Sequence, residues 1–118
     1  MKSKNTFNLE EQLMSVTAIL NEIEQELKEL GRWGGQEKRP AGKAFESTVP
    51  FFLDTMEFHQ WLEYVLVAKF RALISLNKPL PSGMLIHTAA QEVYRGNWQQ
   101  NRKLIALLKS LDDEINRH

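Results

Sequence analysis

His59 and Glu63 are the residues whose types and spacing best fit metal chemistry. They lie four positions apart, so on a helix both side chains would project from one face. A protein-bound metal needs a third and a fourth ligand, and no matching cluster is present in the sequence. We therefore expect His59, and likewise His87, to be exposed or hydrogen-bonded histidines, with no metal and no cofactor.

Other candidates for catalysis have structural interpretations. Asp54 and Glu57 could form an acid/base pair, but both fit helix capping better. Ser47 and Thr48 lack the Gly-x-Ser-x-Gly elbow and a nearby base. The glycines of segment 31–35 match no phosphate-binding loop, and they follow a helical pattern rather than a strand. The sequence therefore predicts that the chain is not an enzyme on its own.

Composition narrows the class of protein further. The 118 residues suit one domain, 1–118, and contain no cysteine, which excludes disulfides and thiolate chemistry. Fifteen basic residues balance fifteen acidic ones, so nucleic-acid binding by the chain alone is disfavoured. No apolar run is long enough for a membrane span, and the charged segment 1–6 leads into Asn8 and Glu10 rather than an apolar stretch. We expect a cytoplasmic protein.

The first predicted helix spans residues 9–30. Asn8 and Glu11 can form a reciprocal cap at its start, and Gly31 can end it in a left-handed conformation. The spacing also fits a coiled coil, so a homodimer is an alternative to the intramolecular bundle that we favour. The apolar stripe consists of Leu9, Leu13, Val16, Leu20, Ile23, Leu27 and Leu30.

A long loop, 31–48, follows this helix. Glycine, proline and charge replace the periodic pattern there, and a loop of this length is usually functional or mobile. We expect Trp33 and Phe45 to hold it to the bundle. Its basic residues are expected to neutralise the acidic first helix, and they are Arg32, Lys38, Arg39 and Lys43.

Three more helices are predicted. Asp54 would cap the second, with Glu57 reaching back and Leu53 packing on Phe58. Its apolar face continues to Ile74, and Asn77 with Pro79 would end it. Ser82 would cap a short third helix that ends at Val93. Gly96 would then separate it from a fourth helix at 98–116, which Asn97 and Gln100 would cap. The predicted fold is an all-α compact bundle of four principal helices, without strands.

One continuous set of motifs resembles the YqcC-like family. The motifs are Ser47-Thr48-x-Pro50-Phe51-Phe52-x-Asp54-Thr55-Met56-Glu57, Trp61-Leu62, Val65-Leu66 and Lys78-Pro79-Leu80-Pro81. The resemblance runs from Leu30 to Tyr94 and weakens towards both ends. It departs in the glycine-rich stretch 31–43 and at Phe58, where the family can carry proline.

This resemblance implies an all-α bundle and a link, by name and gene neighbourhood, to tRNA pseudouridine synthase C. It does not imply that activity, because such synthases use an aspartate after Arg-Leu, whereas Leu53-Asp54 and Leu111-Asp112 here follow Phe52 and Ser110. We expect an accessory interaction protein whose partner is that synthase or another protein. Its predicted contact surface comprises Pro50, Phe51, Phe52, Asp54, Met56, Glu57 and Trp61.

The sequence leaves two alternative functions open. The first is an apolar small-molecule pocket between the second and third helices, beside Trp61. The second is a weak RNA contact through the basic residues of loop 31–48.

Overall fold

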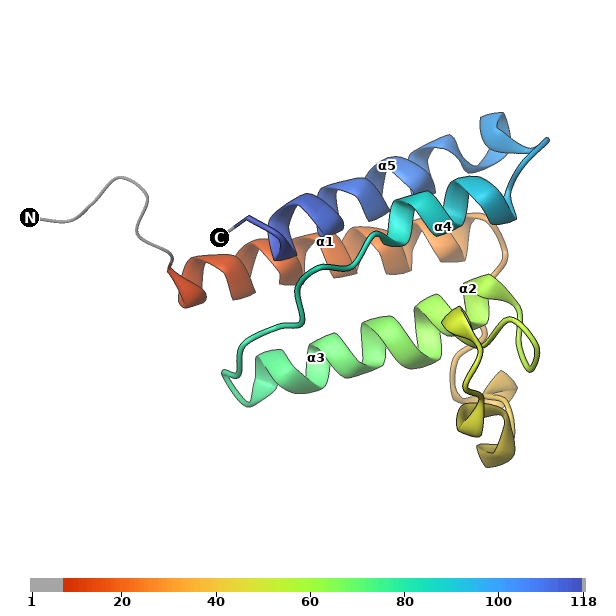
Figure 1. Cartoon of the computed structure of the whole chain (residues 1–118), viewed down its shortest axis with the longest axis horizontal. Coiled ribbons are helices and arrows are strands. Elements are labelled where there is room, and N and C mark those ends of the chain that lie inside the picture. Colours follow the sequence, from red (N-terminus) through yellow and green to blue (C-terminus); the bar gives the residue numbers. More distant parts are fainter. Residues whose placement is uncertain (1–7, 118) are drawn as a thin grey trace, which may run out of the picture.

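A computed structural model describes residues 8–117 of the chain (Figure 1). The segment 1–6, from which the sequence predicts the absence of a signal peptide, lies outside the described residues. A π-helical turn, Leu62–Val67, joins α2 to α3, so that these segments form one continuous helix. The helices are α1 (Leu9–Glu29), α2 (Phe58–Trp61), α3 (Ala68–Ser75), α4 (Ile86–Val93) and α5 (Trp98–Ile115). The predicted all-α fold of four principal helices is thus confirmed.

Successive helices run in opposite directions, with α2–α3 counted as one helix. In Figure 1, α1, α4 and α5 lie together above the long helix α2–α3. Helix α5 has its most extensive contacts with α1 and also packs against α4. The apolar stripe of α1 faces this core, and five of its seven predicted members are buried. The stripe therefore serves the intramolecular bundle, as expected, and is not free to form a coiled-coil dimer. Within residues 8–117, no helix has the length and apolar character that a membrane crossing requires.

Several predicted helix ends are confirmed. The Asn8 side chain accepts the N–H of Glu11 at 3.1 Å and begins α1, which is one half of the predicted reciprocal cap. Gly31 follows that helix with a φ of +73°, a conformation that costs glycine little. Asn77 ends α3 in the same left-handed region, with a φ of +55°. The chain direction therefore changes where the sequence predicts.

The predicted start of the second helix is wrong. The helix begins at Phe58, and the side chains and main chains of Glu57 and Gln60 form a reciprocal capping box. Asp54 lies outside the helix, and Leu53 is 47% exposed while Phe58 is 2% exposed, so the predicted staple is not formed. The reason is a separate turn over residues 52–56, which delays the helix by about one turn.

The predicted caps of the last two helices are also wrong. Asn97 stands at the start of α5, but its side chain forms no capping hydrogen bond. Its main-chain oxygen accepts a hydrogen bond from the side-chain amide of Asn101 at 2.8 Å. Ser82 makes no cap to α4. Instead Asp112 of α5, which is 1% exposed, accepts the N–H of Ile86 at 2.9 Å and that of His87 at 2.8 Å. The same carboxylate lies 2.7 Å from the His87 ring nitrogen. A residue distant in sequence thus completes the first turn of α4.

Candidate interaction surfaces

The junction before α2 has an unusual backbone. Phe51 and Phe52 both have a positive φ, at +57° and +52°, a region in which large side chains are rare. The ring of Phe51 packs edge-on against Trp61, with centroids 4.9 Å apart, and against Phe58 at 5.8 Å. These aromatic contacts offset the cost of the left-handed backbone.

Polar contacts hold the same junction to the preceding loop. The main-chain oxygen of Phe52 accepts the N–H groups of Thr55 and Met56, both at 3.0 Å. The Thr55 hydroxyl donates to the main-chain oxygen of Ala44 at 2.7 Å. The Ser47 hydroxyl donates to the Asp54 carboxylate at 2.5 Å. Asp54 therefore fixes the loop rather than the helix.

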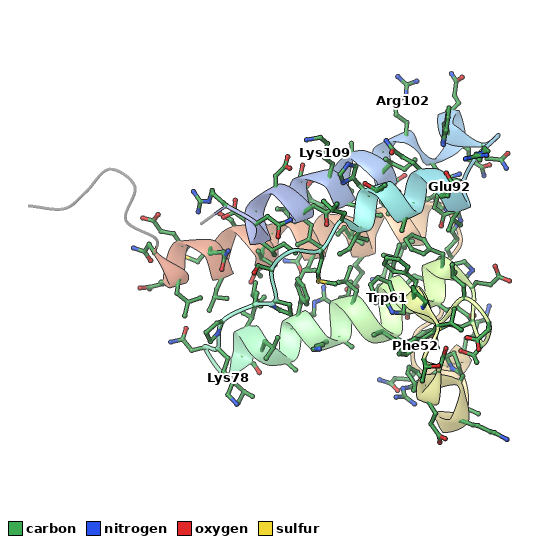
Figure 2. The ribbon with its side chains drawn as sticks, in the orientation of Figure 1. Phe52, Trp61, Lys78, Glu92, Arg102 and Lys109 are labelled. Carbon is green, nitrogen blue, oxygen red and sulfur yellow. The ribbon has the colours of Figure 1, made fainter. Side chains whose placement is uncertain are left out.

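The predicted contact surface divides into a buried part and an exposed part. Met56 and Trp61 are each only 7% exposed, so neither can contribute a contact surface. Pro50, Asp54 and Glu57 are exposed, and both phenylalanines are partly buried. Two unpredicted neighbours, Val49 and Leu53, are 39% and 47% exposed. We refer to Val49, Pro50, Phe52 and Leu53 as the junction patch (Phe52 is labelled in Figure 2).

The rings of Phe51 and Phe58 lie where the sequence predicts a small-molecule pocket. Both lie against Trp61, with the Phe58 ring stacked at 6.1 Å. They occupy space that an apolar ligand beside Trp61 would need.

The four basic loop residues differ in their surroundings. Arg32 donates to the side-chain oxygen of Asn101, and its guanidinium lies 5.0 Å from the centre of the Tyr94 ring. Arg39 lies 4.3 Å from the centre of the Phe45 ring. Lys38 and Lys43 are exposed. Both arginines are thus engaged in holding the fold, which weakens the basic loop as an RNA contact.

Basic residues of the helices, rather than those of the long loop, pair with the acidic residues of α1. Glu24 pairs with Lys28 of α1 at 2.8 Å and with Arg71 of α3 at 2.7 Å. The hydrogen bond from Lys28 lowers the pKa of the Glu24 carboxyl, and Arg71 adds to this effect against the opposing influence of burial. Lys103 of α5 lies 3.8 Å from Glu26. These pairs link α1 to its neighbours in the bundle.

Glu63, which with His59 has the spacing of a metal-ligand pair, anchors the long loop. It is 5% exposed, and its two carboxylate oxygens accept the N–H groups of Gly34 and Gly35 at 2.8 and 2.7 Å. The hydroxyl of Tyr64 donates to the main-chain oxygen of Gly35 at 2.6 Å. Among residues 8–117 there is no group of three or more acidic or histidine side chains placed to hold a metal ion. The sequence signal for this anchor was a lone carboxylate within the apolar run 61–67.

His59 provides a pH-dependent test of this region. Burial lowers the pKa of its ring from 6.5, and the nearby Arg32 lowers it further, while Glu57 and Glu63 oppose the shift. Because the pKa of His59 is lower in the folded protein, its ring takes up a proton at a higher pH in the unfolded chain than in the folded one. The contribution of His59 to stability is therefore lost as the pH falls from 6.5 through the folded-state pKa. We expect an NMR titration of the native protein to place the His59 pKa below 6.5. A value at or above the ordinary one would contradict the geometry.

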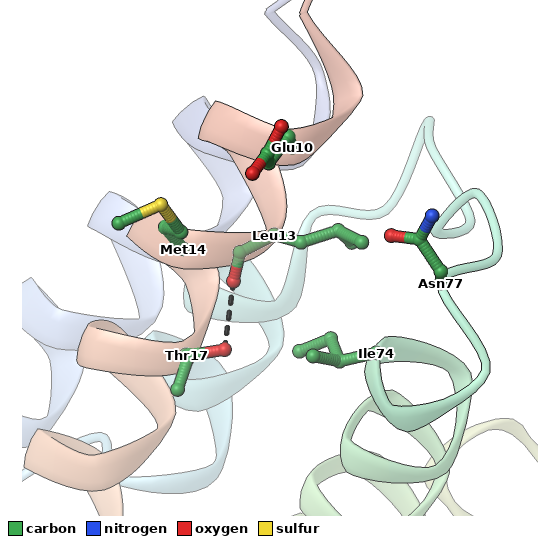
Figure 3. Close-up of a pocket in the computed structure, with 6 residues that line it drawn as sticks. All are labelled: Glu10, Leu13, Met14, Thr17, Ile74 and Asn77. Atoms are coloured by element: carbon green, nitrogen blue, oxygen red, sulfur yellow. Dashed lines mark hydrogen bonds between the residues drawn. The ribbon is translucent and has the colours of Figure 1, made fainter.

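A separate cavity of about 380 Å³ opens between the start of α1 and the end of α3. Figure 3 shows Leu13 and Ile74 facing each other across it, with Glu10 and Asn77 at its rim. Met14 beside it is 69% exposed. This groove lies away from both surfaces that the sequence singled out.

Comparison with known proteins shows which family the chain belongs to. A family model described as tRNA pseudouridine synthase C matches residues 15–114. The chain belongs to the YqcC-like family. It is 32% identical over 93 residues to the uncharacterised protein YqcC of Escherichia coli, covering 79% of this chain and 84% of that protein. An uncharacterised protein of Haemophilus influenzae is 28% identical, over 82% of this chain and 89% of its own length.

The YqcC-like fold is also seen in a solved structure. The solution NMR structure of YqcC from Escherichia coli superposes with a TM-score of 0.77 at 30% identity, covering 88% of this chain and 87% of that one. A third YqcC-like match is of a different kind. It is a protein named tRNA pseudouridine synthase C from Pectobacterium carotovorum, 31% identical over 80% of this chain but only 25% of that protein.

Proposed function

We propose that this chain is a non-catalytic accessory module that associates with tRNA pseudouridine synthase C. The observation that carries the proposal is the Pectobacterium carotovorum relative, in which the matching segment is a quarter of a longer protein with that name. Covalent linkage gives two parts a high effective concentration for each other. Where the same module is a separate chain, a binding surface must replace the linkage.

The buried chemistry of this chain supports a role without catalysis. Asp112 follows Leu111 but is 1% exposed, and both of its carboxylate oxygens are occupied by the first turn of α4. Glu63 is similarly occupied by the loop glycines. A catalytic carboxylate must instead reach the substrate. The roles of Asp112 and Glu63 are therefore explained by the fold.

The junction patch is the surface that we assign to the partner. It combines a left-handed backbone, which in proteins often accompanies function, with exposed apolar side chains next to exposed Asp54 and Glu57. An apolar centre with a polar rim is the usual composition of a protein interface. Phe51 faces the Phe58 and Trp61 rings, which leaves Phe52 as the aromatic contact.

Replacement of Phe52 by alanine is expected to weaken the complex with tRNA pseudouridine synthase C by at least about tenfold, the effect of an interface anchor. The affinity would be measured by titration calorimetry with the two purified proteins. Leu76→Ala is the matched control, because Leu76 is 62% exposed after α3, outside the patch. Phe51→Ala should instead lower the unfolding free energy, by about 2–4 kcal/mol. Absence of a complex, or equal losses for Phe52→Ala and Leu76→Ala, would refute the assignment.

A further inference from the structure

Helix α5 begins with an exposed tryptophan. The Trp98 side chain is 55% exposed, whereas Trp61 is buried and Trp33 is partly buried. Its indole N–H donates to the main-chain oxygen of Gln91 in α4 at 2.9 Å. The hydrogen bond fixes the ring and satisfies its one polar group. The exposed part of the ring is then available for stacking.

Arg102 lies one helical turn after Trp98, and Figure 2 shows its side chain projecting away from the bundle. The two residues line one hollow of about 320 Å³ together with Gln91 and Ile105. Arg102 is exposed and has no ion-pair partner among residues 8–117. An aromatic ring and an uncompensated guanidinium therefore share one small surface.

The lining of this hollow includes one charged side chain, that of Arg102. Segment 94–111 contains no aspartate or glutamate, although the whole chain has equal numbers of acidic and basic residues. Its cations are Arg95, Arg102, Lys103 and Lys109. All but Arg102 have a carboxylate within 4 Å, namely Glu92, Glu26 and Asp113. Arg102 is thus the cation of this segment that is best placed for an external anion.

We infer that the surface formed by Trp98 and Arg102 binds single-stranded RNA. A base would stack on the indole, and an adjacent phosphate would pair with the guanidinium. Stacking on aromatic rings beside basic groups is how single-stranded nucleic acids are commonly held. The choice of RNA rests on the proposed association with a tRNA-modifying enzyme, while the site itself rests on the surface of α5. This site replaces the basic loop, whose two arginines are engaged within the fold.

The test measures fluorescence anisotropy of a labelled oligouridylate of about 12 nucleotides, within the usual site sizes of single-strand binders, on addition of the full chain. Trp98→Ala is expected to weaken binding about 5- to 160-fold, the loss of one stacked base. Trp98→Phe, which keeps a ring, should retain most of the affinity. This second variant separates stacking from any loss of the Gln91 hydrogen bond, and circular dichroism would check that each variant folds.

Arg102→Gln is expected to make the dependence of log K on log salt shallower by about 0.7, the value for one phosphate contact on a single strand. Lys109→Gln is the matched control, because it removes the same charge two turns along α5, where Lys109 already pairs with Asp113 at 2.9 Å. Similar losses for Arg102→Gln and Lys109→Gln would overturn the site, since only general electrostatics would then remain.

The two proposals fail separately. If Trp98→Ala leaves RNA affinity unchanged but weakens the complex with the synthase, the surface is a protein contact and the RNA site is wrong. If RNA binding requires Trp98 but no complex with the synthase forms, the RNA site stands and the proposed association is wrong. No detectable binding of the oligouridylate by the native chain at low salt would also overturn the RNA site.

Discussion

Replacement of Asp112 by alanine is expected to lower the unfolding free energy by about 3–5 kcal/mol, because two N–H groups would lose a buried carboxylate acceptor. The carboxylate is 1% exposed and accepts the N–H groups of Ile86 and His87. It also contacts the His87 ring at 2.7 Å. Without it, two N–H groups at the start of α4 lose their partners in a site closed to water, which is costly.

Urea denaturation of the native protein and of the Asp112→Ala variant would measure this loss in unfolding free energy. Asp113→Ala is the matched control, because the neighbouring carboxylate is exposed and pairs with exposed Lys109. That change should stay within about 0.5 kcal/mol of the native stability. Asp112→Asn, which keeps an acceptor of similar shape, should fall between the two. Equal stability of the Asp112 and Asp113 alanine variants would show that α4 does not depend on this contact.

Replacement of Glu63 by alanine is expected to cost about 3 kcal/mol and to release the segment between α1 and α2, because two buried hydrogen bonds to a charged group are lost. The N–H groups of Gly34 and Gly35 bind this carboxylate at 2.8 and 2.7 Å. Hydrogen exchange should therefore become faster at Gly34 and Gly35 while α5 keeps its protection. Glu37→Ala, at an exposed position of the same loop, is the control.

Gly34 offers an independent route to the same result. A Cβ atom at this position would collide with the Tyr64 hydroxyl and would lie 2.9 Å from the Cβ of Lys38. Gly34→Ala should therefore displace the loop while leaving the Glu63 carboxylate in place. If neither variant changes exchange in the loop, the loop is held by other contacts, such as those of Thr55 with Ala44.

Helix positions could be predicted from the sequence because they depend on local patterns. The apolar spacing in α1 and α5 predicts helices at 9–30 and 98–116, close to the observed Leu9–Glu29 and Trp98–Ile115. The cap at Asn8 and the turn at Asn77 are likewise decided by neighbouring residues. Such features follow from periodicity and turn chemistry alone.

The polar anchors could not be predicted in this way, because their partners are distant in the chain. Asp112 caps a helix that begins 26 residues earlier, and Glu63 binds a glycine 29 residues away. Local reasoning instead selected Asp54 and Ser82, which have the right residue types but other environments. The same limit applies to the candidate surfaces, since the sequence did not show that Trp61 would be buried and Trp98 exposed.

The π-helical turn between α2 and α3 has a consequence for insertions and deletions. A π turn accommodates one residue more than an α turn, and the helix on both sides remains anchored by Phe58 and Phe70. Loss of one residue from Leu62–Val67 would therefore restore a regular α-helix and keep both phenylalanines in the core. The same loss in the middle of α1 would rotate the rest of its apolar stripe by about 100°, out of the core. The π turn thus contributes Leu62, Leu66 and Val67 to the core and, through Glu63, also holds the long loop.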